Sequence, residues 1–121
     1  MIIDNYKSLP TAYSYRTKLE FSVKISGEEL QEKIRKFLSE LTADLKENGC
    51  KLIGHVKGII DAGNIGYLMF SVTSFNEELR FKGNLAGNSN NIELTLNIIV
   101  YGIEKGAVEL VCLRSFRKNF K

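Results

Sequence analysis

Residues 13–47 read YSYRTKLEFSVKISGEELQEKIRKFLSELTADLKE, and this stretch decides the class of fold. In its first part, the odd positions from Tyr13 to Ile25 are mainly apolar or aromatic, and the even positions between them are polar or charged. This period of two predicts a β-strand with one dry face and one wet face. We expect an irregular arm before it, over residues 1–11, which contain the one proline of the chain.

The pattern changes to that of a helix at Ser26. Ser26 and Glu29 fit a capping box, in which the serine hydroxyl accepts a hydrogen bond from the amide of the third helical residue. Apolar residues then recur at the spacing of a single helical stripe, at Leu30, Ile34, Phe37, Leu38, Leu41 and Leu45. Asn48 and Gly49 are typical of a helix C-terminus. We therefore predict a helix over residues 28–47.

The rest of the chain shows strand patterns and no second helical pattern. The strands are expected over Lys51–Ile60, Tyr67–Thr73, Glu78–Leu85, Asn91–Tyr101 and Ala107–Phe116. Residues 60–63 and 103–106 share the form Ile-acid-x-Gly, which suits a tight hairpin turn. We therefore predict a single α+β domain over residues 1–121. It has one long helix packed on a five- to six-stranded, mainly antiparallel sheet, in the order β-α-β-β-β-β-β.

One helix is too narrow to cover such a sheet. A helix is about 10 Å across, whereas six strands at about 4.8 Å spacing make a sheet almost 29 Å wide. Either the sheet curls strongly around the helix, or another subunit covers part of it. Because four strands are apolar on both faces, we expect a homo-oligomer. Its interface candidates are Ile53, Ile59, Met69, Ile99, Val111 and Leu113.

The net charge of +3 comes from one end of the chain. Four of the 17 basic residues lie in the last eight positions, so residues 1–113 carry 13 basic and 14 acidic side chains. We expect residues 114–121 to form a basic tail on a neutral body. This distribution makes nucleic acid an unfavoured partner, because a nucleic-acid-binding domain usually carries a basic face. The candidates for that role are Arg114, Arg117, Lys118 and Lys121.

Few side chains are suited to catalysis or to metal binding. His55 is the only histidine, and Cys50 and Cys112 are the only cysteines. Mechanisms that need two histidines are excluded, and we expect no metal and no cofactor. The two thiols are expected to be reduced and buried, as in a cytoplasmic protein. No segment reads as a signal peptide or a membrane span.

Three functions are compatible with these features. The favoured one is a non-catalytic, self-associating cytoplasmic domain that binds a partner protein or a small hydrophobic ligand. Its ligand-binding candidates are His55, Lys57, Tyr67 and Tyr101. The element order also resembles that of cystatin-like and hot-dog architectures, without a motif of either. The second hypothesis is therefore a hot-dog-like enzyme or binding protein with a pocket at a subunit interface, using His55 or the helix-start residues Glu28, Glu29 or Glu32. The third is nucleic-acid binding through the basic tail.

Overall fold

The computed structural model describes residues 9–76 and 78–120 of the chain. They form a five-stranded sheet with two helices, in the order β-α-β-β-β-β-α. The elements are β1 (Thr11–Ser26), α2 (Gly27–Glu47), β2 (Leu52–Asp61), η1 (Gly63–Ile65), β3 (Gly66–Val72), β4 (Arg80–Leu85), β5 (Asn88–Tyr101) and α3 (Lys105–Phe120). The predicted α+β class and antiparallel sheet are confirmed. Residues 1–8 of the predicted arm and Lys121 of the predicted tail lie outside the described residues.

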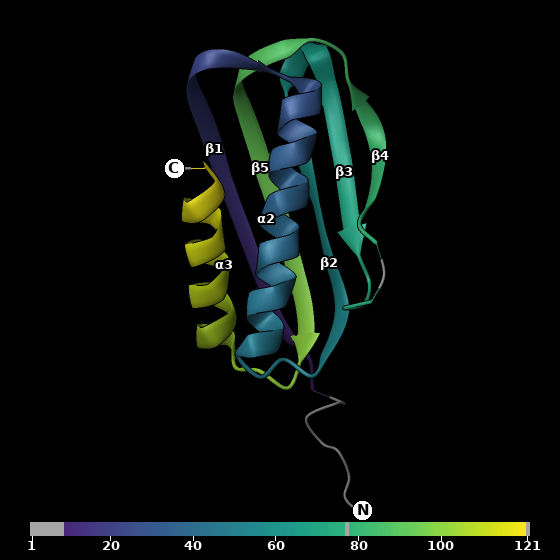
Figure 1. The fold of residues 1–121 in the computed structure, drawn as a ribbon, viewed down its shortest axis with the longest axis vertical. Helices are drawn as coiled ribbons and strands as arrows, with labels where there is room; N and C mark the ends of the chain where they lie inside the picture. The colour runs from purple at the N-terminus through teal and green to yellow at the C-terminus, as the bar shows by residue number, and fades with distance from the viewer. Residues whose placement is uncertain (1–8, 77, 121) are drawn as a thin grey trace, which may run out of the picture.

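The sheet has the strand order β1-β5-β2-β3-β4, and every pair of neighbours is antiparallel. Figure 1 shows both helices on the same side of this sheet, with α2 over its middle and α3 beside α2 over β1. The sheet is not strongly curled, so the second helix supplies the cover that one helix could not. None of the helices formed by the described residues has the length and apolar character needed to span a bilayer.

The predicted last strand, Ala107–Phe116, is wrong, because these residues belong to α3. The buried residues of α3 have the helical spacing i, i+3, i+4, i+7 and i+8, namely Val108, Val111, Cys112, Ser115 and Phe116. Val111 is therefore buried in the core of its own chain, and Leu113 lies on the same helix, so neither is on a sheet face. The prediction of both as interface residues is therefore wrong, because it assumed the alternating faces of a strand where the chain forms a helix.

The helix α2 is the element that follows its sequence pattern most closely. All six residues of its predicted apolar stripe are buried. The amide of Glu29 donates to the Ser26 hydroxyl oxygen at 3.1 Å, as the capping box predicts. Because of this cap, α2 begins directly after β1 ends. Buried residues of β1 and of α2 belong to the same core cluster.

A bulge in β2 reverses part of the predicted face assignment. The pairing of β2 with β5 shifts between Ile53 and His55, so that Gly54 is an extra residue on the β2 side. Before the bulge the side chains change faces: Ile53 is only 3% exposed and lies in the core, whereas Leu52 is 47% exposed. The prediction of Ile53 as an interface residue is therefore wrong.

Residues 114–120, predicted as part of a basic tail, form the second half of α3. Arg114 Nε lies 4.0 Å from Asp44 Oδ2, and Lys118 Nζ lies 3.3 Å from Glu40 Oε1. Both cations are thus paired with acids of α2. The Phe116 and Phe120 rings stack with their centroids 5.2 Å apart, and both also contact the ring of Phe37. These contacts attach the end of the chain to the core.

Candidate functional site: the open face of the sheet

The sheet face opposite the two helices is not covered by any described residue, and we call it the open face. The strand register orders its side chains in three rows that run across all five strands. The Asp61 row contains Lys18, Glu93, Asp61, Tyr67 and Asn84. The Ile59 row contains Arg16, Thr95, Ile59, Met69 and Lys82. The Lys57 row contains Ser14, Asn97, Lys57, Ser71 and Arg80.

The four predicted ligand-binding residues, His55, Lys57, Tyr67 and Tyr101, all lie on the open face, together with the predicted interface residues Ile59, Met69 and Ile99. They do not converge on one point. Tyr67 pairs with Asp61, which lies six residues, or roughly 20 Å, along β2 from His55. His55 pairs instead with Ile99, close to Tyr101 at the other end of β5. The structure therefore brings these residues to one surface but not into one pocket.

A hollow with a cationic lining lies on the open face over β2, β3 and β4. Its volume is about 430 Å³, and its described lining residues are Lys57, Gly58, Met69, Phe70, Ser71, Arg80, Phe81 and Lys82. We call it the cationic hollow. Arg80 and Lys82 were not among the predicted site residues. The sequence contains the signal that β4 has one wet face, but only the register shows that this face adjoins Lys57.

A second hollow lies at the other end of the open face, over β1, β5 and the end of β2. Its volume is about 670 Å³, and its charged lining residues are Lys18, Glu20, Asp61 and Glu93. We call it the acidic hollow. Arg16 Nη2 lies 3.3 Å from Glu93 Oε1, and the Gly63 amide donates to Asp61 Oδ1 at 3.0 Å. That second bond fixes the Asp61 carboxylate at the end of β2.

The residues predicted for the enzyme hypothesis lie on opposite sides of the sheet. Glu28, Glu29 and Glu32 belong to α2, in the helix layer, and His55 is on the open face. Glu29 accepts a hydrogen bond from the Ser26 hydroxyl at 3.3 Å, and Glu32 accepts one from Arg35 at 3.2 Å. Within one chain, His55 and these glutamates therefore do not share a pocket. In the described part of the chain, no group of three His, Cys, Asp or Glu side chains is placed to hold a metal ion.

The nucleic-acid candidates lie on α3, away from the open face. Arg114 and Lys118 are paired with acids of α2, while Arg117 is exposed and Lys121 lies outside the described residues. Phe116 is only 2% exposed. An aromatic ring must present a free face to stack on a base. This segment therefore does not present its aromatic and basic side chains together.

Among the described residues, the ionisable groups with clearly shifted pKa values belong to the core cluster or pack against it. Burial raises the pKa of the Cys112 thiol to about 12, and the nearby Glu109 carboxylate acts in the same direction. Burial also raises the pKa of Cys50, and it raises that of Tyr13 to about 12. Both cysteines are buried and free, as predicted. Thiols held in the neutral form in this way are poor nucleophiles.

No protein-family model matches this chain, and no curated protein is similar to it at a significant level. Two solved structures match it, both of YjiA GTPase with bound Zn(II). The E. coli protein has a TM-score of 0.49 and 15% sequence identity, and a triple mutant of YjiA has a TM-score of 0.48 and 15% identity. Each match covers 91% of this chain and 30% of the other. The chain thus spans about 30% of the length of the GTPase chains that it matches.

Proposed function

We propose that this chain is a non-catalytic binding domain that pairs with a second copy of itself through the open face of its sheet. One observation carries the proposal. On β2, Ile59 lies at the centre of the open face, with Lys57 two residues before it and Asp61 two residues after it on the same face. An apolar residue flanked by opposite charges at equal distances makes a surface complementary to itself.

The pairing follows from two-fold symmetry. If two open faces meet with their β2 strands antiparallel and cross at Ile59, each Lys57 lies opposite Asp61 of the second copy. By the same operation Glu93 meets Asn97, and Tyr67 meets Ser71. Arg16 and Lys82, which share the row of Ile59, lie on the two edge strands, where the twist of stacked sheets carries them apart from their own copies.

The size of the open face also supports a pair. Five strands at about 4.8 Å spacing are about 24 Å wide, and ten residues along β5 span about 34 Å. The resulting area of about 800 Å² is what each partner of a standard-sized interface buries. Three of the six exposed large hydrophobic side chains in the described part of the chain are on this face: Leu52, Tyr67 and Met69. Covering them removes apolar surface from water.

The direct test is the mass of the protein in solution. We expect light scattering after size-exclusion chromatography to give twice the chain mass of 13.7 kDa at micromolar concentration. Ile59→Lys should give a monomer, because it puts two like charges on the symmetry axis. Leu110→Lys is the matched control, because Leu110 is 63% exposed but lies on α3. A wild-type protein that stays monomeric at 100 micromolar, or equal effects of the two variants, would refute the proposal.

A charge-reversal experiment tests the orientation. Lys57→Glu alone puts two acids together at both symmetry-related contacts, and Asp61→Lys alone puts two cations there, so each variant should dimerise at least tenfold more weakly than the wild type. When the two variants are mixed, one contact regains a pair of opposite sign and the other keeps the native pair. We expect the mixture to form heterodimers. Failure of the mixture to associate more strongly than either variant would exclude this orientation.

The same proposal includes a cytoplasmic location, which the two buried, free cysteines support. It also includes a binding role in place of catalysis. This is supported by the separation of His55 from the helix-start glutamates, because a general acid or base needs a second polar group within hydrogen-bonding reach of the substrate.

A further inference from the structure

Three basic residues are close neighbours of one serine on the open face. Lys57, Ser71 and Arg80 are consecutive cross-strand partners on β2, β3 and β4, so the Cα atoms of Lys57 and Arg80 are about 10 Å apart. Lys82 follows Arg80 by two residues on the same face and pairs with Met69. All three line the cationic hollow of about 430 Å³, and so does Ser71, which lies between Lys57 and Arg80 in the strand register.

Within the described part of the chain, these cations have no acidic partner. None of the described residues that line the hollow is an Asp or a Glu. The ion pairs found among residues 9–76 and 78–120 involve Arg16, Arg35, Arg114 and Lys118, and none involves Lys57, Arg80 or Lys82. Cations held this close repel one another, and a bound anion would relieve that repulsion.

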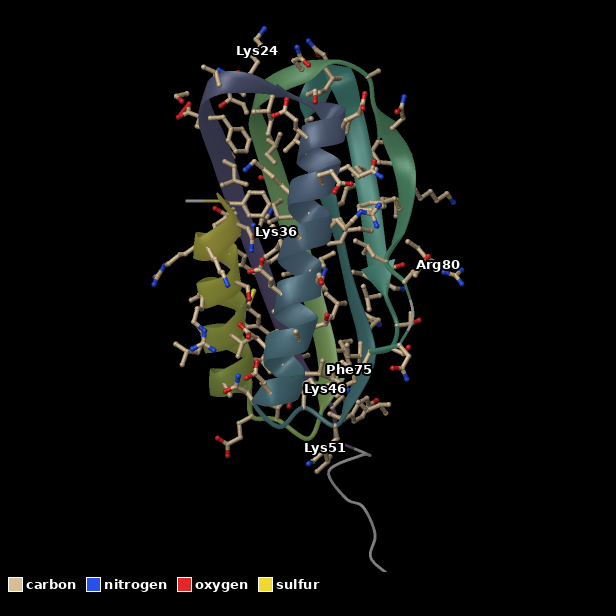
Figure 2. All side chains as sticks on the ribbon, viewed as in Figure 1. Lys24, Lys36, Lys46, Lys51, Phe75 and Arg80 are labelled. Atoms are coloured by element: carbon tan, nitrogen blue, oxygen red, sulfur yellow. The ribbon has the colours of Figure 1, made fainter. Side chains whose placement is uncertain are left out.

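Protection of a sheet edge explains only part of the cluster. Edge strands commonly carry Lys or Arg to prevent pairing with other chains, and β4 is an edge strand. Figure 2 shows Arg80 projecting outward from this edge. Lys57 is on β2, which has β5 on one side and β3 on the other, so it does not protect an edge. Edge protection therefore does not account for the place of Lys57 beside the two edge cations.

The chemistry of the group favours phosphate. A guanidinium offers a planar fork of donors that matches phosphate oxygens, the two ammonium groups add point charges, and a serine hydroxyl donates one more hydrogen bond. The three positive charges match the several negative charges of a pyrophosphate better than the single negative charge of a carboxylate. The acidic hollow on the same face interrupts the positive surface, so a long polyanion would be repelled by its carboxylates. A small ligand does not reach the acidic hollow and avoids this repulsion.

We propose that the cationic hollow binds the phosphate groups of a small phosphorylated ligand, with Lys57, Arg80 and Lys82 as the charged contacts and Ser71 as a hydroxyl donor. This site goes beyond the self-association proposed above and does not rest on it. Because Lys57 serves in both, phosphate and the second copy are expected to compete for the open face.

The test is titration of the full chain with inorganic pyrophosphate at low ionic strength, by calorimetry and by amide chemical shifts. We expect saturable binding below 1 mM, with the largest shifts at residues 57, 71, 80 and 82. Lys57→Gln and Arg80→Gln should each weaken binding at least tenfold. Lys24→Gln is the matched control, since Lys24 is an exposed lysine that Figure 2 shows at the top of the molecule, far from Arg80. It should change the affinity less than twofold.

Other probes separate this site from general anion binding. Acetate at equal ionic strength should bind at least tenfold more weakly than pyrophosphate. The affinity for a single-stranded oligonucleotide should not increase with its length. The proposal is overturned by non-saturable binding, by equal losses in Lys57→Gln and Lys24→Gln, or by affinity that rises with oligonucleotide length. A monomeric protein that binds pyrophosphate would refute self-association and leave this site standing. Because the two compete, the reverse result is a protein that dimerises but still does not bind pyrophosphate after dilution to the monomer: it would refute the site and leave self-association standing.

Discussion

The Phe116 ring of α3 packs edge-on against the Phe37 ring of α2, with the ring centroids 6.1 Å apart. Both side chains are at most 2% exposed. Phe116 also meets Tyr15 of β1 edge-on, with centroids 5.3 Å apart, so one ring joins both helices and the first strand. The helix α3 is therefore part of the core that supports the sheet.

Phe116→Ala should destabilise the protein by about 3–5 kcal/mol, because it removes a buried ring and leaves a cavity between three elements. Urea unfolding followed by circular dichroism measures this change. Arg117→Ala is the control, since its exposed side chain is next in sequence and should change the free energy of unfolding by less than about 0.5 kcal/mol. A loss below 1 kcal/mol for Phe116→Ala would mean that α3 does not form part of the core.

The helix α3 could not be recognised by the same reasoning that identified α2. In α2 every apolar residue of the stripe is buried, so the helical period of the buried positions is visible in the sequence. In α3 the buried stripe contains the polar Ser115, while the apolar Leu110 is 63% exposed. Val108, Leu110 and Cys112 therefore imitate the alternation of a strand. Packing against α2 stabilises residues 105–120 as a helix, and a local sequence pattern does not show this tertiary contact.

The open face was predicted in part. The alternation within each strand was sufficient to assign Ile59, Met69 and Ile99 to it. Ile53 was misassigned because a one-residue bulge reverses the faces before it. The cationic hollow could not be predicted, because it depends on which strands are neighbours. The register that joins Lys57 to Arg80 through Ser71 follows from pairing across the whole sheet.

Gly58→Ala should destabilise the protein by about 1–3 kcal/mol. A Cβ at this position would overlap the Phe70 ring and the Thr95 carbonyl oxygen, so the neighbouring strands would have to move. Gly106 is the control: a Cβ there meets nothing within 4 Å, and in α3 alanine is the better helix former. Thermal unfolding should show a lower midpoint for Gly58→Ala and an unchanged or higher one for Gly106→Ala. Equal midpoints would contradict the close approach of Phe70.

Ser115→Ala should stabilise the protein by about 1 kcal/mol. Ser115 Oγ is the one buried side-chain oxygen or nitrogen in the described residues that lacks a hydrogen-bond partner. Such an unsatisfied group has lost its water without compensation. The carbonyl of Ser115 accepts from Asn119 Nδ2 at 2.8 Å, and alanine keeps that bond.

The control for Ser115→Ala is Ser39→Ala, an exposed position on α2 that reports the gain in helix propensity alone. Chemical unfolding measures the stability of both variants. The gain in helix propensity is common to them, so the difference between them gives the contribution of the buried Ser115 hydroxyl. If Ser115→Ala gains no more stability than Ser39→Ala, the Ser115 hydroxyl has a partner in solution.

Stability should fall as the pH rises above about 9, through the Cys112 thiol. Its pKa is raised from 9.0 to about 12 in the folded state by burial and, to a smaller degree, by Glu109. Between these values the unfolded chain releases the thiol proton and the folded chain keeps it. The unfolded state thus binds fewer protons, and the free energy of unfolding decreases by up to about 1.4 kcal/mol per pH unit. Below pH 8 the thiol is protonated in both states and contributes no slope.

Urea unfolding of the wild type and of Cys112→Ala at pH 7.5, 9 and 10 tests this assignment. The variant should lose part of the decline between pH 9 and 10, whatever its stability at pH 7.5, because only the slope reports the thiol. Some decline should remain, since burial also raises the pKa of Cys50. Tyr13 adds to it only above pH 10, because burial raises its pKa from 10.0 to about 12. Parallel pH profiles for the two proteins would show that Cys112 ionises equally in the folded and unfolded states.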